Sequence, residues 1–100
     1  MAITKKDLQY EVDRLNNKYC KNTKHKLYVS QAYGGYQVNL TGKRRKDGKG
    51  FRGYLGSGAT HITYGHDTAR NTLKKLFEVD SRGYIKEKVN YFEKQKRYWK

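Results

Sequence analysis

Hydrophobic residues recur with a helical period over the first twenty positions. Four of them occupy positions i, i+4, i+7 and i+11, which is one stripe of a 3.6-residue repeat. Thr4 precedes the stripe and Asp7 follows three residues later, a spacing that is typical of a capping box. The sequence therefore predicts an amphipathic helix that packs through Leu8, Val12, Leu15 and Tyr19.

The clearest β signal is a hairpin over 27–41. The pair Gly34-Gly35 separates two alternating segments, and both central positions of a type I′ turn require φ > 0, which glycine adopts without steric cost. With this turn, Val29 faces Leu40. The predicted core face carries Leu27, Val29, Tyr33, Tyr36, Val38 and Leu40. The predicted solvent face carries Tyr28, Ser30, Ala32, Gln37, Asn39 and Thr41.

A third strand is predicted at 59–64, where Thr, Ile and Tyr alternate with Ile62 and Tyr64 directed inward. The last third of the chain is helical. Asp67 or Thr68 can start a helix, which Asp80-Ser81-Arg82-Gly83 interrupts. The buried face of this helix is predicted to hold Ala69, Leu73, Leu76 and Phe77, and that of the next helix Ile85, Val89 and Phe92.

The predicted fold is one α+β domain over residues 1–100, a three-stranded antiparallel sheet with helices on one face, in the order α-β-β-β-α-α. Neither an internal repeat nor a Pro-rich or Ser-rich linker divides the chain. Residues 42–53 combine six basic residues with four glycines, which predicts a flexible basic loop. Residues 94–100 form a basic, aromatic tail, either ordered or disordered.

Charge narrows the class of function. The chain has 23 Lys and Arg against 9 Asp and Glu, a net charge of +14. A surface this positive favours a polyanionic partner, and nucleic acid is the commonest one in a cytosol. Without a disulfide framework, a secretory signal or a membrane span, the chain is expected to be cytoplasmic, with no membrane partner.

Enzyme chemistry is not predicted. Cys20 is expected at the end of a helix, where the macrodipole raises a thiol pKa, so we interpret it as a structural residue. His61 and His66 lack the further ligands that zinc requires, and the carboxylates are too scattered for a metal-dependent nuclease. The glycines of 48–58 do not have phosphate-loop spacing. We therefore expect no catalytic residues, no metal and no cofactor.

Basic residues interleaved with aromatic ones remain as the candidate binding site. Such clusters neutralise phosphates without reading base sequence, and an exposed ring on a sheet can stack on a base. The predicted nucleic-acid-binding residues are Lys43, Arg44, Arg45, Lys46, Lys49, Arg52, Arg70, Lys74, Lys75 and Tyr28. The alternatives are a solvated basic loop without a partner and tyrosines that belong to the rim of the core.

The element order over 4–79 resembles the double-stranded RNA-binding domain fold, with 65–76 in the place of its second helix. That family opens this helix with a Lys-Lys-x-Ala-Lys run that grips phosphates. Only Ala69 and Arg70 match in kind here, and His66-Asp67 stand where lysines are expected. The first inter-strand loop of that family is also longer than the turn predicted here, so the likeness implies a fold and no function.

A second resemblance covers nearly the whole chain. Segments 21–24, 32–43, 68–73 and 80–83 look like small, functionally uncharacterised proteins encoded by bacteriophages of Gram-positive bacteria. This resemblance implies expression in a bacterial host cytoplasm, where such proteins commonly handle nucleic acid or redirect a host protein. It brings no catalytic residues with it.

Two functions are therefore expected from the sequence. The first is a small, basic nucleic-acid-binding protein of weak sequence selectivity, with either DNA or RNA, single- or double-stranded, as its partner. The alternative is a phage-encoded effector that docks on an acidic host protein. Tyr91, Tyr98 and Trp99 would then supply the aromatic contacts.

Overall fold

The computed structural model describes residues 2–23, 25–41 and 60–94. The elements in chain order are α1 (Lys5–Leu15), a π-helical turn η1 (Asn16–Cys20), β1 (Lys26–Ala32), β2 (Gly35–Thr41), β3 (Thr60–His61), α2 (Ala69–Ser81) and α3 (Tyr84–Lys94). The α+β class and the antiparallel pairing of β1 with β2 are confirmed. The predicted loop 42–53 and the tail beyond Lys94 lie outside the described residues.

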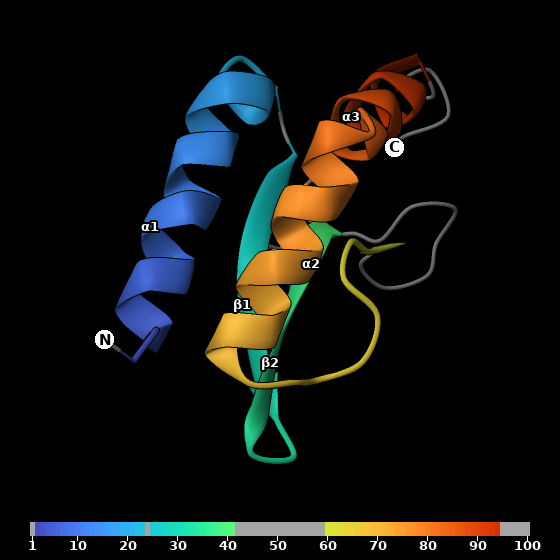
Figure 1. Ribbon diagram of the computed structural model, residues 1–100. Helices are drawn as coiled ribbons and strands as arrows, with labels where there is room; N and C mark the ends of the chain where they lie inside the picture. The colour runs from blue at the N-terminus through green and yellow to red at the C-terminus, as the bar shows by residue number, and fades with distance from the viewer. Residues whose placement is uncertain (1, 24, 42–59, 95–100) are drawn as a thin grey trace, which may run out of the picture.

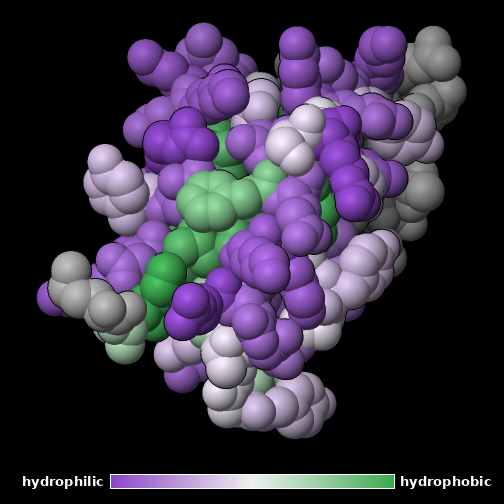
Figure 2. Space-filling view, in the orientation of Figure 1, coloured by the Kyte–Doolittle hydropathy of each residue, from purple (hydrophilic) through white to green (hydrophobic). Residues whose placement is uncertain are grey.

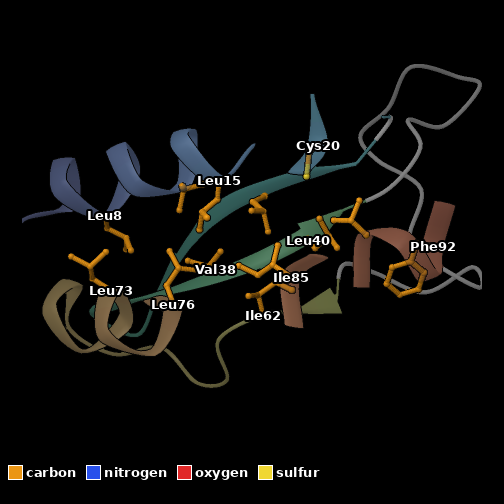
Figure 3. Packing of buried hydrophobic residues seen from close by; sticks show 13 residues of the cluster. Leu8, Leu15, Cys20, Val38, Leu40, Ile62, Leu73, Leu76, Ile85 and Phe92 are labelled. Carbon is orange, nitrogen blue, oxygen red and sulfur yellow. The ribbon is translucent and has the colours of Figure 1, made fainter. Parts of the chain in front are cut away.

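Helices α1 and α2 lie side by side in front of the hairpin (Figure 1). α1 contacts β1, α2 contacts β2, and the two helices contact each other. Side chains from both helices and from one face of the hairpin meet in a single hydrophobic cluster (Figure 3). The cluster includes Leu8, Leu15, Leu27, Val38, Leu40, Leu73 and Leu76. The opposite face of the hairpin therefore points away from α1 and α2.

The ends of the helices follow their capping residues. The Asp7 carboxylate accepts a hydrogen bond from the backbone N–H of Thr4 at 2.8 Å, and the predicted capping box is present. The hydroxyl of Thr68, the N-cap of α2, accepts from the backbone N–H of Asn71 at 3.1 Å. α2 ends before Gly83, whose φ of 74° is a left-handed conformation that glycine adopts easily. The predicted starts of both helices are thus confirmed.

The end of the first helix differs from the prediction. After Leu15 the chain widens into η1, and this one-residue insertion rotates the following side chains. Cys20 is buried in the core, whereas Tyr19 is only half-buried against it. The Asn16 side chain bonds both backbone groups of Leu27, accepting from N at 2.7 Å and donating to O at 2.9 Å. This pair of bonds fixes the turn against the edge of β1.

The hairpin turn lies one residue earlier than predicted. Ala32 pairs with Gly35, so Tyr33 and Gly34 are the central residues, with φ of 54° and 73°. Positive φ at both is what a type I′ turn requires. The register therefore pairs Val29 with Val38 instead of Leu40. Tyr33 was predicted on the core face and is 97% exposed.

Close approach of another segment explains why Gly35 is not in the turn. A Cβ on Gly35 would lie 2.8 Å from the backbone N of Asp67. Asp67 and Tyr36 exchange two backbone hydrogen bonds, of 2.7 and 3.0 Å, beside this glycine. Gly35 is therefore required for the packing of segment 60–67 on β2, and the turn is left to its two predecessors.

The predicted third strand at 59–64 is not confirmed as a regular strand. β3 pairs with β2 only through Asn39↔His61 and Leu40↔Thr60. Beyond it, the N–H groups of Ile62 and Thr63 both donate to the Val38 carbonyl, and the Thr63 hydroxyl accepts from the Val38 N–H at 3.0 Å. The chain thus bulges away from β2 until it rejoins at Asp67.

Two aromatic residues that were predicted in the core lie elsewhere. Ile62 is buried as expected, but the bulge that follows leaves Tyr64 70% exposed. Phe77 of α2 is 49% exposed because Thr72, which is fully buried, occupies the helix face that meets the sheet. The predicted stripe of α3, by contrast, is confirmed by the buried side chains of Ile85, Val89 and Phe92.

Candidate nucleic-acid interface

The face of the sheet opposite α1 and α2, here called the outer face, carries a row of three side chains. Pairing places Tyr28 beside Asn39 and Asn39 beside His61. Cross-strand partners share a face and neighbours along a strand alternate. Because Leu27 and Leu40 point into the core, all three residues of the row point outward. Lys26, which is exposed, lies on the same face two positions before Tyr28.

A chain of hydrogen bonds crosses the outer face. The Gly65 backbone N–H donates to Gln37 Oε1 at 2.9 Å, Gln37 Nε2 donates to Asn39 Oδ1 at 2.8 Å, and Asn39 Nδ2 donates to the Tyr28 hydroxyl at 3.3 Å. Gln37 and Asn39 were predicted to face solvent, yet both are buried. Their bonds to each other and to Gly65 and Tyr28 satisfy amide groups that burial would otherwise leave unpaired.

Nearer the hairpin turn, two rings lie against each other on the same face. Ser30 lies two positions after Tyr28 along β1, on the same face. Its hydroxyl is 3.3 Å from Nε2 of His66. The His66 ring meets the Tyr33 ring edge-on, with centroids 5.7 Å apart. The segment that bulges from β2 thus holds His66 over the sheet, where its ring contacts Tyr33 and leaves that tyrosine exposed.

A second ring pair lies at the β3 edge of the sheet. His61 and Tyr64 meet edge-on with centroids 5.8 Å apart, and both residues are exposed. Lys75 lies next to them, since its Nζ donates to the Tyr64 carbonyl at 3.2 Å and lies 3.4 Å from an Asp67 oxygen. Tyr64 is therefore an exposed ring on a backbone that α2 anchors.

Among the described residues, Asp67 places a carboxylate beside this surface, and groups of α2 bond that carboxylate. Its Oδ1 accepts from the Asn71 side chain at 3.1 Å and from the Thr68 backbone N–H at 2.7 Å. These bonds, with Lys75 adding to them, lower the pKa of Asp67 below its ordinary value. The negative charge of Asp67 is therefore used in bonds at the start of α2.

The structure separates the predicted binding residues that it describes. Arg70 and Lys74 are exposed on α2, on the helix-covered side of the sheet. Tyr28 is half-buried on the outer face. Lys75 contacts the Tyr64 carbonyl and the Asp67 carboxylate, between the helix-covered side and the outer face. The remaining six, Lys43, Arg44, Arg45, Lys46, Lys49 and Arg52, lie outside the described residues.

The segment that holds those six residues starts and ends at one end of the sheet. It follows Thr41, the last residue of β2, and precedes Thr60, the first of β3. Thr60 pairs with Leu40, next to Thr41, so both attachment points are adjacent. Lys26 pairs with Thr41 at this same end.

Carboxylates of the described residues are largely used within the fold. Six of the eight bond neighbouring groups, namely Asp7, Glu11, Asp13, Asp67, Asp80 and Glu93. Exposed basic residues are less often paired: Arg70 and Lys74 make no ion pair within the described part of the chain. Positive charge therefore remains on the surface, while negative charge is committed to caps and side-chain pairs.

Three observations concern thiol chemistry, metal binding and membrane insertion. Burial raises the pKa of the Cys20 thiol to about 11, which keeps it protonated and unreactive near neutral pH. Among residues 2–23, 25–41 and 60–94, no three His, Cys, Asp or Glu side chains gather where they could hold a metal ion. Across the same residues, every helix is too short or too polar to span a membrane.

Comparison with known proteins gives no match: no protein-family model fits the sequence, and neither a curated protein nor a solved structure is similar to it. The interpretation of the surface therefore depends on its own residues.

Sequence reasoning did not select four of the rings on the outer face: Tyr33, His61, Tyr64 and His66. Two signals were present. His61 precedes Ile62, which was predicted to point inward, and alternation alone directs His61 outward. The Tyr-Gly-Gly sequence also admits a turn at Tyr33-Gly34, which exposes the tyrosine. The contact of His66 with Ser30 depends on the bulge, which no local sequence pattern predicts.

Proposed function

We propose that the protein binds nucleic acid, chiefly through positive charge and with weak sequence selectivity. The observation that carries the proposal is the uneven use of charge. Most carboxylates of the described fold are bonded internally, whereas basic side chains stay exposed. A polyanion can therefore contact cations on this chain without displacing their carboxylate partners, and binding releases counterions from phosphates.

The attachment of segment 42–59 supports the same proposal. Its basic residues, from Lys43 to Arg52, are tethered at both ends beside Lys26, at the end of the sheet that also presents Tyr28 and His61. Phosphate contacts from this segment and ring contacts from the outer face can then be made by one bound strand. Arg70 and Lys74 would add phosphate contacts only for a longer ligand that passes around the sheet.

A salt titration tests the proposal. Binding of fluorescein-labelled single- and double-stranded DNA and RNA is measured by anisotropy at several salt concentrations. The quadruple variant Lys43→Gln, Arg44→Gln, Arg45→Gln, Lys46→Gln removes four charges from the basic segment. Each phosphate contact contributes about 0.7 to 0.9 to the slope of log K against log salt, so this variant should flatten the slope by about 3.

The matched control removes four charges elsewhere, with Lys6→Gln, Lys18→Gln, Lys86→Gln and Lys94→Gln on α1, η1 and α3. Both variants have the same net charge, so a general electrostatic effect would weaken them equally. The proposal requires a larger loss in the basic-segment variant. Absent binding at low salt, or binding that does not depend on salt, would contradict it.

A second candidate function is docking on an acidic protein, and exposed hydrophobic side chains favour it. Hydrophobic atoms form a strip between α1 and α2, rimmed by polar side chains (Figure 2). Tyr91 of α3 is also exposed and packs edge-on against Phe92 at 5.1 Å. If the protein acts in a bacterial host, a partner should survive nuclease treatment of the lysate and be lost on Tyr91→Ala or Phe77→Ser. Loss of all partners with nuclease favours the first function.

A further inference from the structure

We propose that the outer face binds single-stranded nucleic acid by stacking bases on its exposed rings. This inference rests on the proposed function and specifies its ligand. Two ring pairs lie beside Tyr28: His61 with Tyr64, both exposed, at the β3 edge, and the half-buried His66 with the exposed Tyr33 near the hairpin turn. Rings on a sheet accept unpaired bases of any sequence, because every base has a π-face.

The spacing of the rings allows two bases of one strand to stack at the same time. His61 lies in the row of Asn39, and His66 contacts Ser30 in the row of Gln37. The two rows are two residues apart along the strands, about 7 Å, and His61 on β3 and Ser30 on β1 are separated by two strand spacings, about 10 Å. The two stacking positions therefore lie on a diagonal of the sheet, far enough apart for two different bases of an extended strand. The bases of a duplex are stacked on each other and cannot stack on these rings.

Charge on the outer face is compatible with phosphates. The outward positions of the paired strands hold Lys26 and neutral side chains, and none of those described is a carboxylate. The carboxylate of Asp67, which lies beside this face in the described part of the chain, is bonded to Asn71, Thr68 and Lys75 at the start of α2. Among the described residues, a strand that crosses the face would meet a cation and no free carboxylate.

The hydrogen-bond chain explains why this surface should bind with weak selectivity. Base edges are read by groups such as Asn and Gln amides. Gln37 and Asn39 are buried and already bond Gly65, Tyr28 and each other. The groups that could distinguish one base from another are thus occupied in holding the face together, and the rings remain as the contact surface.

Backbone strain at Tyr33 supports a role for its ring. Tyr33 has a φ of 54°, and a non-glycine residue is less stable there than in the right-handed region. The side chain is exposed and recovers little of this cost by burial. Strained residues of this kind cluster at functional sites. Stacking of a base on the Tyr33 ring would be a function that accounts for an exposed tyrosine at this strained position.

Alanine variants of the exposed rings test the inference. Wild type, His61→Ala and Tyr64→Ala are titrated against labelled dT20, rU20 and a 20-base-pair duplex. Removing one stacking ring should weaken binding to dT20 or rU20 about fivefold or more, since a stacked base contributes about 1 kcal/mol or more. The slope of log K against log salt should stay unchanged, because no charge is removed.

Controls separate stacking from misfolding. Tyr64→Phe keeps the ring and should bind within twofold of wild type. Tyr10→Ala removes a ring that is 74% exposed on α1, away from the outer face, and should leave binding unchanged. Melting temperatures of all variants are measured by circular dichroism. An affinity loss that follows the melting temperature instead of the ring would overturn the inference.

The failures of the two proposals are distinguishable. If His61→Ala and Tyr64→Ala bind dT20 and rU20 like wild type, or if the duplex binds more tightly, the outer face is not the stacking surface. Loss of salt-dependent binding in the basic-segment variant would still support nucleic-acid binding in that case. If wild type binds none of the three probes at low salt, both proposals are wrong.

Discussion

Tyr33→Asn should stabilise the protein although it removes an aromatic side chain. Tyr33 occupies a type I′ turn with φ of 54°, and asparagine is several-fold enriched over other non-glycine residues in this region. That enrichment corresponds to about 0.6 to 1 kcal/mol in favour of asparagine. Against it stands the loss of the edge-on contact with His66, worth about 0.5 kcal/mol at an exposed site. The net gain is about 0.1 to 0.5 kcal/mol.

Urea and thermal unfolding, followed by circular dichroism, measure this gain. For a chain of this size, 0.5 kcal/mol raises the melting temperature by about 2 to 4 °C. Tyr33→Ala serves as the control because it loses the ring without relieving the backbone. The two variants should therefore differ by about 1 kcal/mol, with asparagine the more stable. If asparagine is no more stable than alanine, the turn is not strained at this residue. Both variants should also bind dT20 more weakly than wild type.

Three further changes test the packing of the fold. Gly35→Ala places a Cβ against the Asp67 backbone at 2.8 Å and should cost about 1 to 3 kcal/mol of unfolding free energy, seen as a lower urea midpoint at unchanged m. Asn16→Ala leaves Leu27 N–H and C=O without their side-chain partner and should cost about 2 to 3 kcal/mol in the same assay; a loss below 0.5 kcal/mol would contradict the hydrogen bonds. Cys20 should resist thiol reagents in the native state. Burial raises the pKa of its thiol from 9.0 to about 11. The free energy of unfolding should therefore fall as the pH rises from 9 to 11, because only the unfolded thiol releases its proton in this range. At pH 10 the loss should be about 1.4 kcal/mol relative to Cys20→Ala, and equal pH profiles of the two proteins would refute it.

Helices and their ends could be predicted because local sequence determines them. The Thr4 and Thr68 caps and the apolar stripe of α3 are encoded within one or two turns of chain. The faces of the hairpin were also mostly correct despite the wrong turn. Moving the turn by one residue changes each partner by two positions, so that Val29 meets Val38 instead of Leu40 and remains on the core face.

Contacts between distant segments explain the errors. Local chemistry favours Gly34-Gly35 as the turn, because tyrosine is disfavoured at positive φ. The backbone of Asp67 approaches Gly35 too closely for any side chain, and this long-range requirement determines which residues turn. The same segment brings His66 over the outer face. The candidate site therefore depends on the 60–67 bulge, whose path has no local signal.

The amide of Asn16 acts toward β1 as the peptide group of a neighbouring strand would. It bonds the backbone N–H and C=O of Leu27 at the free edge of β1, since β2 pairs with the other edge of this strand. Unpaired edges of this kind recruit strands from other molecules. Unwinding of η1 would withdraw the amide and open the edge while the rest of the sheet is still folded. A local opening of a single helical turn, well before global unfolding, would thus expose a strand edge to other molecules.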